Sequence, residues 1–393
     1  MKIAILTSGI LSVPAVQGGA VENLTDFYLE YNNQHRLHDI TIYSVWHPDV
    51  EKHPAMRSNV NHYVYIKVTG LWARLKKKWY QLTHDEEYYH YTIEFYLHEA
   101  IKDIRRRSYD IILIENRPAY ALKLKEESNA KLVYHLHNEK LDDKSEKAID
   151  IYNAATRIIT VSNYIKSCIL TINHDDKKTT TVYNGIDLHA FSSCTQSINR
   201  NSIGLQEDDF VMVFSGRVTA EKGIMQLIEA MTLLQDIPRI KLLVIGSSFY
   251  GNDDNENAFA NALRGKAAHL SNRIIFTGFI PYAQMPIYLQ MADIAVIPSI
   301  WNDPFPTTVL EAQAMGLPII STQRGGIPEE VTEESAILLD TNENFVDNLA
   351  TAIRDLYQHP EKRKTIGQAG LMRSKYFDKE RFAKDFFKAI QTI

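Results

Sequence analysis

The sequence predicts an α/β protein made of two Rossmann-like domains, each built on a parallel sheet. Short apolar runs alternate with helix-like segments along the whole chain, as in parallel strands joined by crossover helices. At 393 residues the chain is too long for one ordinary core and suits two domains. A stretch rich in Ser, Thr, Asn and Gln between Ser192 and Asn201 is typical of a linker and divides the chain near its middle.

The composition narrows the class of protein. The formal net charge is −5, with 23% charged and 45% hydrophobic residues, as in an ordinary soluble protein, and this argues against general nucleic-acid binding. Cys168 and Cys194 lack metal-ligand spacing and indicate a reducing compartment. Met1 leads directly into an apolar run without a secretory leader, and no run approaches the length of a membrane span. We therefore expect a cytoplasmic protein.

The first predicted strand, residues 2–7, is followed by a loop that carries Gly18 and Gly19 ahead of a helix at 21–31. Adjacent glycines at a helix start let backbone approach a ligand closely, although a plain tight turn is the alternative. The loop lacks the spaced three-glycine fingerprint of dinucleotide dehydrogenases, and no acidic residue ends the second strand, 40–46, as that fingerprint requires. Both features disfavour an NAD-dependent dehydrogenase.

A basic and aromatic segment follows in the first domain. If residues 71–82 form a helix, its large apolar side chains fall on one stripe with cations beside it: Leu71, Trp72, Leu75, Trp79 and Leu82, flanked by Arg74, Lys76, Lys77 and Lys78. Such a helix can lie on an anionic bilayer, which would make the protein peripheral on the inner face of the cell membrane. Alternatively, the stripe packs on the domain and the lysines are solvated.

Two more buried strands, 111–115 and 131–136, are predicted around a helix at 118–127. The second strand runs into a His-Leu-His-Asn sequence, in which alternation places His135 and His137 on one face. The carboxyl end of a strand is where α/β sheets place ligand contacts. The two histidines could hold a metal, but no third ligand is evident nearby.

Strands at 157–161 and 179–183 complete the first domain. Between them, Ser162 lacks a Gly-x-Ser-x-Gly elbow, so we interpret it as the cap of a helix at 163–172.

The second domain begins with a strand at 210–214 and a loop that carries Arg217 and Lys222 among glycines, ahead of a helix at 224–234. Two cations beside a helix start suit a diphosphate, although each alone could be a surface charge. Further strands at 242–245 and 274–277 follow, with a polar segment at 250–257 expected to be mobile.

The stretch from Ile297 to Glu330 is the most informative. A strand at 294–297 gives way to a Pro-rich loop with Asp303, and Thr307 and Thr308 precede a helix at 309–315. The free N–H groups at that helix start form an anion site. Glu311 within the helix would repel phosphate and better suits neutral hydroxyls such as a ribose diol. A sugar nucleotide offers both groups.

The remaining elements alternate in the same way. We predict a helix at 283–291, strands at 318–322 and 336–339, and helices at 345–358, 361–376 and 379–390. The last helix has Phe382, Phe386 and Phe387 at helical spacing, so it is amphipathic.

Several motifs together resemble those of the retaining family-4 glycosyltransferases with the GT-B fold. They are Pro298-Ser299, Asp303-Pro304-Phe305, Leu310-Glu311-Ala312, Gly316-Leu317-Pro318, Gly325-Gly326-Ile327-Pro328-Glu329, and Asn184-Gly185-Ile186-Asp187 with Phe191. That family carries two acidic residues with seven between them, usually both Glu, and this chain has Asp303 at the first place. The resemblance implies two Rossmann-like domains facing across a cleft, 1–192 and 205–376, with a C-terminal helix in 377–393 crossing back to the first.

The resemblance also implies roles for individual residues. Arg217 and Lys222 match the pyrophosphate-binding pair, and His137, with His135 as the fallback, matches the histidine that touches the donor sugar. We expect Asp303, His137, Arg217 and Lys222 to be catalytic. The expected donor-binding residues are Gly18, Gly19, Arg217, Lys222, Phe279, Ile280, Asp303, Phe305, Pro306, Thr307, Thr308 and Glu311, with Phe279 and Ile280 holding the base through the backbone.

The implied reaction moves a sugar from a nucleotide diphosphate, more commonly UDP than GDP, to a glycan or lipid-linked glycan acceptor of a bacterial surface polysaccharide. The chain has no Asp-x-Asp triplet to carry a manganese ion, so we expect no metal and no cofactor. A nucleotide-sugar epimerase of similar architecture is one alternative. A non-catalytic sugar-nucleotide-binding protein is another, because Asp303 departs from the usual Glu.

Overall fold

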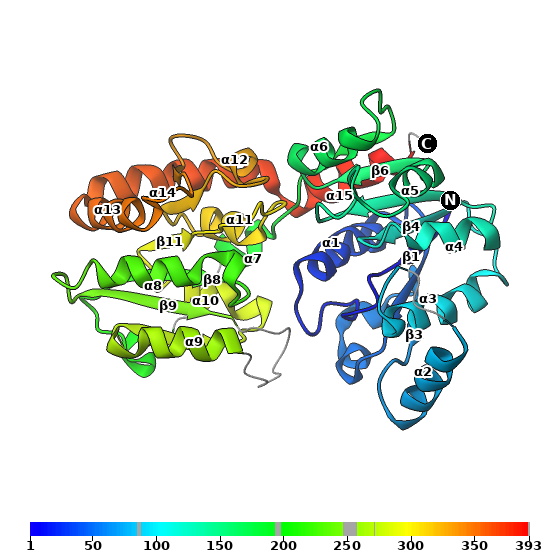
Figure 1. Ribbon diagram of the computed structural model, residues 1–393, viewed down its shortest axis with the longest axis horizontal. Coiled ribbons are helices and arrows are strands. Elements are labelled where there is room, and N and C mark those ends of the chain that lie inside the picture. The colour runs from blue at the N-terminus through cyan, green and yellow to red at the C-terminus, as the bar shows by residue number, and fades with distance from the viewer. Residues whose placement is uncertain (85–87, 193–197, 247–257, 271, 392–393) are drawn as a thin grey trace. The chain divides into compact units, whose positions relative to one another are not determined.

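The computed structural model describes residues 1–393 apart from 85–87, 193–197, 247–257, 271 and 392–393. It contains two α/β units, each with a fully parallel sheet between layers of helices (Figure 1), so the predicted fold class of two Rossmann-like domains is confirmed. One unit joins Met1–Asn184 to the C-terminal segment from Glu380, and the other is Gly185–Lys379. The polar segment predicted at 250–257, Cys194 and the middle of the predicted linker lie outside the described residues.

The sheet of the first unit has the strand order β3-β2-β1-β4-β5-β6-β7. Its strands are β1 (Lys2–Leu6), β2 (Asp39–Val45), β3 (Asn61–Ile66), β4 (Ile111–Glu115), β5 (Lys131–Leu136), β6 (Arg157–Thr160) and β7 (Thr179–Thr181). Because every neighbouring pair is parallel, all carboxyl ends meet at one edge. The sequence analysis did not predict β3, an edge strand that is only partly buried and whose residues are less apolar than those of the central strands.

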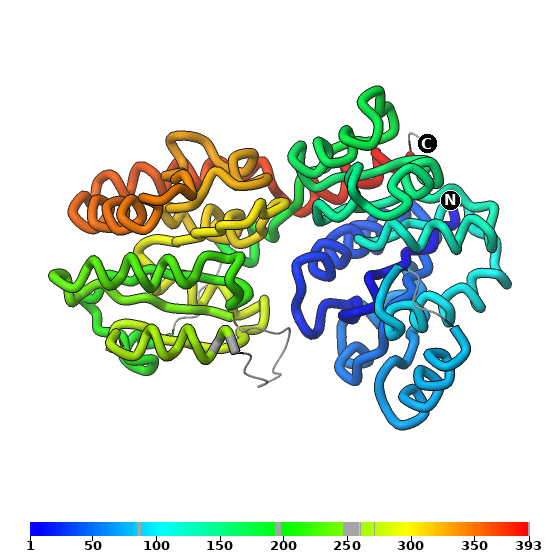
Figure 2. Tube along the Cα trace, viewed as in Figure 1, coloured from blue at the N-terminus to red at the C-terminus, as the bar shows by residue number. Residues whose placement is uncertain are grey.

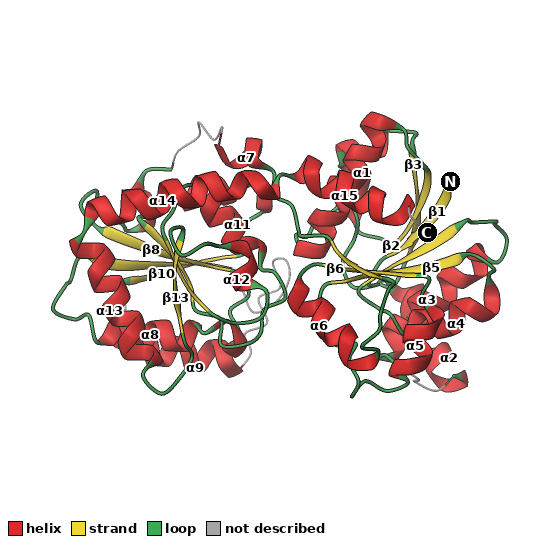
Figure 3. Ribbon diagram, turned by 90° about the horizontal axis from the view of Figure 1, so that it is seen from above, coloured by secondary structure: helices red, strands yellow, loops and turns green. Residues whose placement is uncertain are grey.

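Helices cover both faces of this sheet. They are α1 (Ala20–His35), α2 (Leu71–Thr83), α3 (Tyr91–Ile104), α4 (Tyr120–Glu127), α5 (Ala148–Ala154), α6 (Asn163–Ile172) and α15 (Lys379–Gln391), with short 3-10 turns at Pro48–Lys52 and Pro54–Arg57. Figure 3 shows α1 and α15 on one face and α3, α4 and α5 on the other. The Ser162 hydroxyl accepts a hydrogen bond from the N–H of Ile165 at 3.2 Å, so the predicted cap of α6 is confirmed.

The C-terminal helix α15 packs in the core of the first unit. Phe382, Phe386 and Phe387 are buried there with Tyr28 of α1, and the rings of Tyr28 and Phe386 stack at 4.3 Å and 6°. Figure 2 shows the end of the chain lying beside its first helix, although more than 300 residues separate them in sequence. The predicted return of the C-terminal helix to the first domain is confirmed.

The helix α2 presents its apolar stripe to solvent. Leu71, Trp72, Trp79 and Leu82 are 73%, 78%, 65% and 78% exposed, whereas the helix packs through Ala73 and Tyr80. Of the two alternatives, the one in which this stripe packs on its own domain is therefore wrong. Several large apolar side chains exposed side by side are unusual on a protein surface and mark a contact with a partner or a membrane.

The sheet of the second unit has the order β10-β9-β8-β11-β12-β13. Its strands are β8 (Phe210–Ser215), β9 (Ile240–Ile245), β10 (Ile274–Gly278), β11 (Ile294–Ile297), β12 (Ile319–Thr322) and β13 (Ala336–Leu339). Its helices are α7 (Leu188–Ser192), α8 (Ile224–Thr232), α9 (Ala258–Ala267), α10 (Met285–Leu289), α11 (Thr307–Ala314), α12 (Ile327–Glu330), α13 (Phe345–Gln358) and α14 (Pro360–Ser374), with 3-10 turns at Arg200–Ile203, Ala220–Lys222, Ala268–Leu270, Tyr282–Gln284 and Lys375–Phe377. The strands predicted at 294–297 and 336–339 and the helix predicted at 345–358 agree residue for residue.

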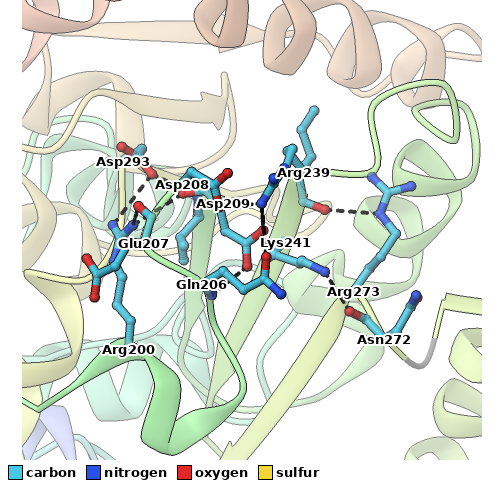
Figure 4. A network of polar contacts seen from close by, with 12 residues as sticks. Arg200, Gln206, Glu207, Asp208, Asp209, Arg239, Lys241, Asn272, Arg273 and Asp293 are labelled. Atoms are coloured by element: carbon cyan, nitrogen blue, oxygen red, sulfur yellow. Dashed lines mark hydrogen bonds and ion pairs between the residues drawn. The ribbon is translucent and has the colours of Figure 1, made fainter.

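Charged residues close the amino edge of this second sheet (Figure 4). Asp209, Arg239, Arg273 and Asp293 each stand immediately before a strand. The guanidinium of Arg273 donates to the carbonyl of Ile240 at 3.0 Å, and the carboxylate of Asp293 accepts from a backbone N–H of β8 at 2.8 Å. These charged groups form hydrogen bonds and ion pairs with one another and with the backbone, so they stabilise this edge of the sheet.

Candidate functional site

The loop between β11 and α11 lies at the carboxyl edge of the second sheet and is held in place by one carbonyl group. The carbonyl oxygen of Glu221 accepts hydrogen bonds from the N–H groups of Ile300 at 3.1 Å and Trp301 at 3.3 Å, and from the Ser299 hydroxyl at 3.3 Å. Glu221 belongs to the 3-10 turn Ala220–Lys222 that follows β8. The loops after two neighbouring strands are therefore joined into one surface.

Two glycines let other loops approach this segment. Gly223 has φ +72°, and a Cβ there would lie 1.8 Å from the carbonyl oxygen of Pro298. Gly325 has φ +58°, and a Cβ there would lie 2.1 Å from the carbonyl oxygen of Asp303, which also accepts the N–H of Gly326 at 2.7 Å. A side chain at either position would displace backbone. The glycines of the two motifs therefore hold the loop from both sides.

Lys222 and Asp303 form a hydrogen-bonded ion pair on this surface, with side chains 18% and 6% exposed. The Lys222 ammonium also lies 5.6 Å from the ring centroid of Trp301. Arg217, on the same loop as Lys222, pairs with Glu221 at 3.4 Å, and both of those side chains are about 40% exposed. The two predicted cations thus lie on one edge, but only Lys222 contacts the predicted acid.

The helix α11 begins at Thr307, two residues earlier than predicted, so Thr307 and Thr308 form its first turn instead of preceding it. Pro306 occupies the N-cap position in an extended conformation, and within the described part of the chain no side chain caps the helix. The N–H groups of its first turn therefore keep the partial positive charge that favours an anion.

Glu311 lies in this helix and is buried. Burial raises the pKa of its carboxyl group to about 7, although a hydrogen bond from Thr307 opposes this change. A carboxyl group that is half-ionised at neutral pH can accept hydrogen bonds from hydroxyls, and it repels a nearby phosphate less than a fully ionised carboxylate does. The ring of Phe305, by contrast, is buried and packs on the ring of Phe377, with the two centroids 5.7 Å apart.

Glu330 is an acid at this edge that the sequence analysis did not single out. It is fully buried, and among the described residues neither of its carboxylate oxygens has a hydrogen-bond partner. Burial, followed by the charges of Asp303 and Glu329, raises its pKa well above the ordinary value and so favours its neutral form. Its position after the Gly-Gly-Ile-Pro-Glu motif was the only available signal.

Phe279 and Ile280 follow the edge strand β10 and are partly exposed. The N–H of Gly246, after β9, donates to the carbonyl of Gly278 at 2.9 Å, which ties the two strand ends together. All predicted residues of the second unit therefore lie in α11 or in loops at the carboxyl edge of one sheet.

Gly18 and Gly19 lie at the carboxyl edge of the first sheet, where Gly19 is the N-cap of α1 with φ +104°. A Cβ on Gly19 would lie 2.2 Å from a carboxylate oxygen of Glu22, which is buried against this turn. Burial raises the pKa of Glu22 to about 8; a hydrogen bond from its own N–H opposes the rise and the charge of Glu115 adds to it. Glu22 is therefore a neutral acid at the helix start, and the sequence analysis missed it.

His135 and His137 have adjacent rings, with centroids 4.1 Å apart, as strand alternation requires. Both contact the carboxylate of Glu115, the last residue of the neighbouring strand β4, at 3.1 Å and 3.0 Å. These three residues, the Glu115 trio, have donor atoms within 4.8 Å of one another, and that spacing alone would also suit a metal ion. The sequence analysis found no third ligand near the two histidines, whereas the structure places Glu115 beside them. The adjacency of β4 and β5 could have indicated this residue.

Two family models match consecutive parts of the sequence. The model described as Glycosyltransferase Family 4 matches residues 31–190, and the model described as Glycosyl transferases group 1 matches residues 195–372.

Solved structures with the same fold include Anabaena Alr3699/HepE in complex with UDP-glucose and the sucrose-phosphate synthase of Thermosynechococcus elongatus. Both have a TM-score of 0.76 and 20% identity; the first covers 100% of both chains, the second 100% of this chain and 98% of its own. This likeness confirms the predicted GT-B fold class.

Two proteins of Bacillus subtilis (strain 168) are similar in sequence over most of their length. Spore coat protein SA is 29% identical over 94% of this chain and 93% of its own length. YtcC, whose name calls it a glycosyltransferase, is 31% identical over 90% of this chain and 82% of its own length. Together with the two family models, this similarity shows that the chain belongs to the group 1 glycosyl transferases of Glycosyltransferase Family 4.

Proposed function

We propose that this glycosyltransferase moves a sugar from a nucleotide diphosphate donor, in the first place a UDP-sugar, to a hydroxyl of a glycan or lipid-linked glycan, with retention and without a metal ion. The observation that carries the proposal is the Lys222–Asp303 pair in a loop clamped by glycines, directly before the uncapped start of α11. A cation beside free helix N–H groups suits a diphosphate.

The same groups would assist departure of the diphosphate. Negative charge builds on the leaving phosphate as the bond to the sugar breaks, and Lys222, Arg217 and the first turn of α11 supply positive charge for it. The Lys222 ammonium is already oriented by Asp303 before any ligand binds. Pre-set charges of this kind cost no reorganisation during the reaction.

Retention follows in this proposal from attack on the same face of the sugar. A bond forms between the acceptor oxygen and the anomeric carbon as the bond to the phosphate oxygen breaks, and that phosphate oxygen takes the acceptor proton. Asp303 is held by Lys222, and Glu330 is buried, so neither is presented as a nucleophile. In this scheme Asp303 and His137 orient the donor sugar.

The donor nucleotide would lie along the second unit. In this proposal Glu311 accepts hydrogen bonds from the ribose hydroxyls. Phe279 and Ile280, which are partly exposed, hold the base through their backbone. Gly18 and Gly19 would face the donor phosphates and the acceptor. The relative in Anabaena was solved with UDP-glucose, which supports a UDP-sugar as the first candidate.

A surface polysaccharide role has two sources of support. The lipopolysaccharide 1,2-N-acetylglucosaminetransferase of Salmonella typhimurium is 25% identical over 77% of this chain and 78% of its own length. The exposed stripe of α2 also carries Arg74 and Lys76 to Lys78 with no acidic residue in the helix, which suits an anionic bilayer surface. In the part of the chain that the structure describes, every helix is too short or too polar to cross a bilayer.

The direct test is a panel of UDP-, GDP-, ADP- and dTDP-sugars in the presence of a chelator, read by nucleotide release and thermal shift together. We expect both readouts from one donor, a UDP-sugar. Sugar isomerisation without nucleotide release would instead identify an epimerase. Binding without release with any acceptor glycan would identify a non-catalytic sugar-nucleotide-binding protein.

A further inference from the structure

The carboxylate of Glu115 is surrounded by hydrogen-bond donors from distant parts of the first unit. It accepts from the Tyr28 hydroxyl at 2.8 Å and lies 3.1 Å from Nδ1 of His135 and 3.0 Å from Nε2 of His137. Glu115 and His135 are 1% and 0% exposed. Three contacts on one buried carboxylate form a built site, because its charge is costly to bury without them.

The contacts determine where the ring hydrogens lie. Burial raises the pKa of Glu115, but the charge of His135 and the hydrogen bonds from His135 and His137 outweigh it and bring the pKa to about 2. An ionised carboxylate only accepts hydrogen bonds, so each ring nitrogen in contact with it carries a hydrogen. The 3.1 Å approach of the two ring nitrogens to each other is then a contact between two donors that share one acceptor.

His137 has one further ring atom to offer. Burial, followed by the charge of His135, lowers its pKa to about 4 in spite of Glu115, so its ring is neutral and carries a single hydrogen, at Nε2. Its Nδ1 then bears a lone pair, and it has no hydrogen-bond partner among the residues that the structure describes. The side chain keeps 6% of its surface exposed.

We propose that Glu115 is a positioning residue that locks His137 in the Nε2–H tautomer, so that Nδ1 is presented as a hydrogen-bond acceptor to a sugar hydroxyl. The identity of the ligand rests on the proposed function, whereas the tautomer does not. The proposal assigns His137 the opposite role from a cationic or donating histidine. A hydroxyl group that donates to Nδ1 would be the part of the ligand that this side chain selects.

The surroundings of the trio hold its geometry. The N–H of His137 donates to the side-chain oxygen of Asn116 at 3.1 Å, and the N–H of Asn116 donates to the carbonyl of His135 at 2.9 Å, so the two strand ends are tied together. Phe386 of α15 stacks on Tyr28 and has its centroid 5.0 Å from that of His135. The C-terminal helix thus holds two of the three donors in place.

The test is a long-range proton–nitrogen NMR spectrum of protein labelled with nitrogen-15 histidine, at pH 7 with chelator, and with His137→Asn used to assign the signal. We expect the Nε2–H pattern for His137 in the unaltered protein. An Nδ1–H pattern, or a doubly protonated ring, would overturn the proposal. A shift of the Nε2 signal that requires added Zn²⁺ and disappears with chelator would overturn it as well, because the trio would then be a metal site.

Two variants test whether the Glu115 carboxylate, and not its other contacts, sets the tautomer of His137. Glu115→Gln brings an amide N–H toward one ring nitrogen, so we expect the His137 tautomer to become mixed or to reverse. Tyr28→Phe is the matched control: it removes one donor, keeps the ring on Phe386, and should leave the tautomer unchanged. A reversed tautomer in Tyr28→Phe with an unchanged one in Glu115→Gln would contradict the assignment of the positioning role to Glu115.

Kinetics connect the tautomer to the reaction. With the donor found in the panel, Glu115→Gln should lower kcat/KM at least about tenfold at a temperature where its melting curve shows the variant to be folded, as expected for loss of one buried hydrogen bond to substrate. Unchanged kcat/KM with a reversed tautomer would overturn the ligand contact. If the unaltered protein transfers no sugar, the proposed function fails while the NMR result still decides the tautomer.

Discussion

The acids at the carboxyl edges of the two sheets are buried to a similar extent but are paired differently. In the first unit, Glu115 receives three donors and has a pKa of about 2, so it is ionised. In the second unit, Asp303 is paired with Lys222, whereas burial raises the pKa of Glu311 to about 7 and the pKa of Glu330 well above its ordinary value. Glu115 at the first edge is thus satisfied internally, whereas Glu22 at the same edge and Glu311 and Glu330 at the second have raised pKa values.

This difference suggests that the acids of the two sheets have different roles. A carboxylate with three internal donors orients its neighbours and is unavailable to a ligand, while a neutral or half-ionised buried acid gains from a hydroxyl that enters its site. The amino edge of the second sheet gives a third case, in which charged groups such as Arg239 and Arg273 serve the strands alone (Figure 4).

The largest expected effect is on turnover. The double variant Arg217→Ala with Lys222→Ala should lower kcat at least about 1000-fold, because both cations that would stabilise the leaving diphosphate are removed. Circular dichroism and a melting curve check the fold, since loss of Lys222 leaves Asp303 unpaired. The matched control, Arg239→Ala with Lys241→Ala at the amino edge, removes the same charge and should keep activity within about threefold. Normal turnover in the first variant would remove our electrostatic account.

The second effect is on stability and its dependence on pH. The folded-state pKa of Glu311, about 7 because of burial, lies above its ordinary value of 4.5, so its contribution to stability is present below pH 4.5 and is lost as the pH rises through 7. Glu311→Gln cannot ionise. Its free energy of unfolding should therefore rise relative to the unaltered protein by on the order of 3 kcal/mol between pH 4.5 and pH 8.

Urea unfolding at several pH values measures this difference, with the exposed Glu333→Gln as a control that should leave the pH dependence unchanged. Glu115 has the opposite sign: its pKa is lowered to about 2, so its contribution is present above pH 4.5 and is lost as the pH falls through 2. Glu115→Gln should therefore lose stability at neutral pH. The same pH dependence in both variants would show that the two edges are not paired as described.

The smallest effect concerns the exposed helix α2. Trp72→Ser with Trp79→Ser should weaken binding to vesicles containing anionic lipid by about tenfold or more, because two apolar side chains are lost from the contact. Both side chains are exposed, so the free energy of unfolding should change by less than about 0.5 kcal/mol. Met372→Ser, an exposed apolar residue of the second unit, is the control. Equal vesicle binding by all three proteins would rule out a membrane contact through α2.

Much of the fold follows from local pattern. Central parallel strands are buried on both faces, so they appear as short apolar runs, and β4, β5, β11 and β13 were predicted with their observed bounds. The edge strand β3 was not predicted, because it is partly exposed and carries polar residues. The start of α11 was placed late because its first turn contains two threonines, which favour caps in general and here lie inside the helix.

The partners of the site residues could not be predicted in the same way. That Lys222 contacts Asp303 while Arg217 contacts Glu221 depends on how two loops cross, which local pattern does not encode. Glu115 was within reach, since carboxyl ends of neighbouring parallel strands share an edge. Its contacts with Tyr28, and those of Tyr28 with Phe386, required knowing where α1 and α15 pack.

The measurement that tests the central claim most directly is calorimetric titration of the donor found in the panel into the unaltered protein and into Glu311→Ala. If the carboxyl edge of the second sheet holds the ribose of a nucleotide sugar, the variant should bind the donor about 30-fold more weakly, or on the order of 2 kcal/mol, because a buried acceptor for the hydroxyls is lost. An unchanged dissociation constant would contradict the placement of the nucleotide on this edge.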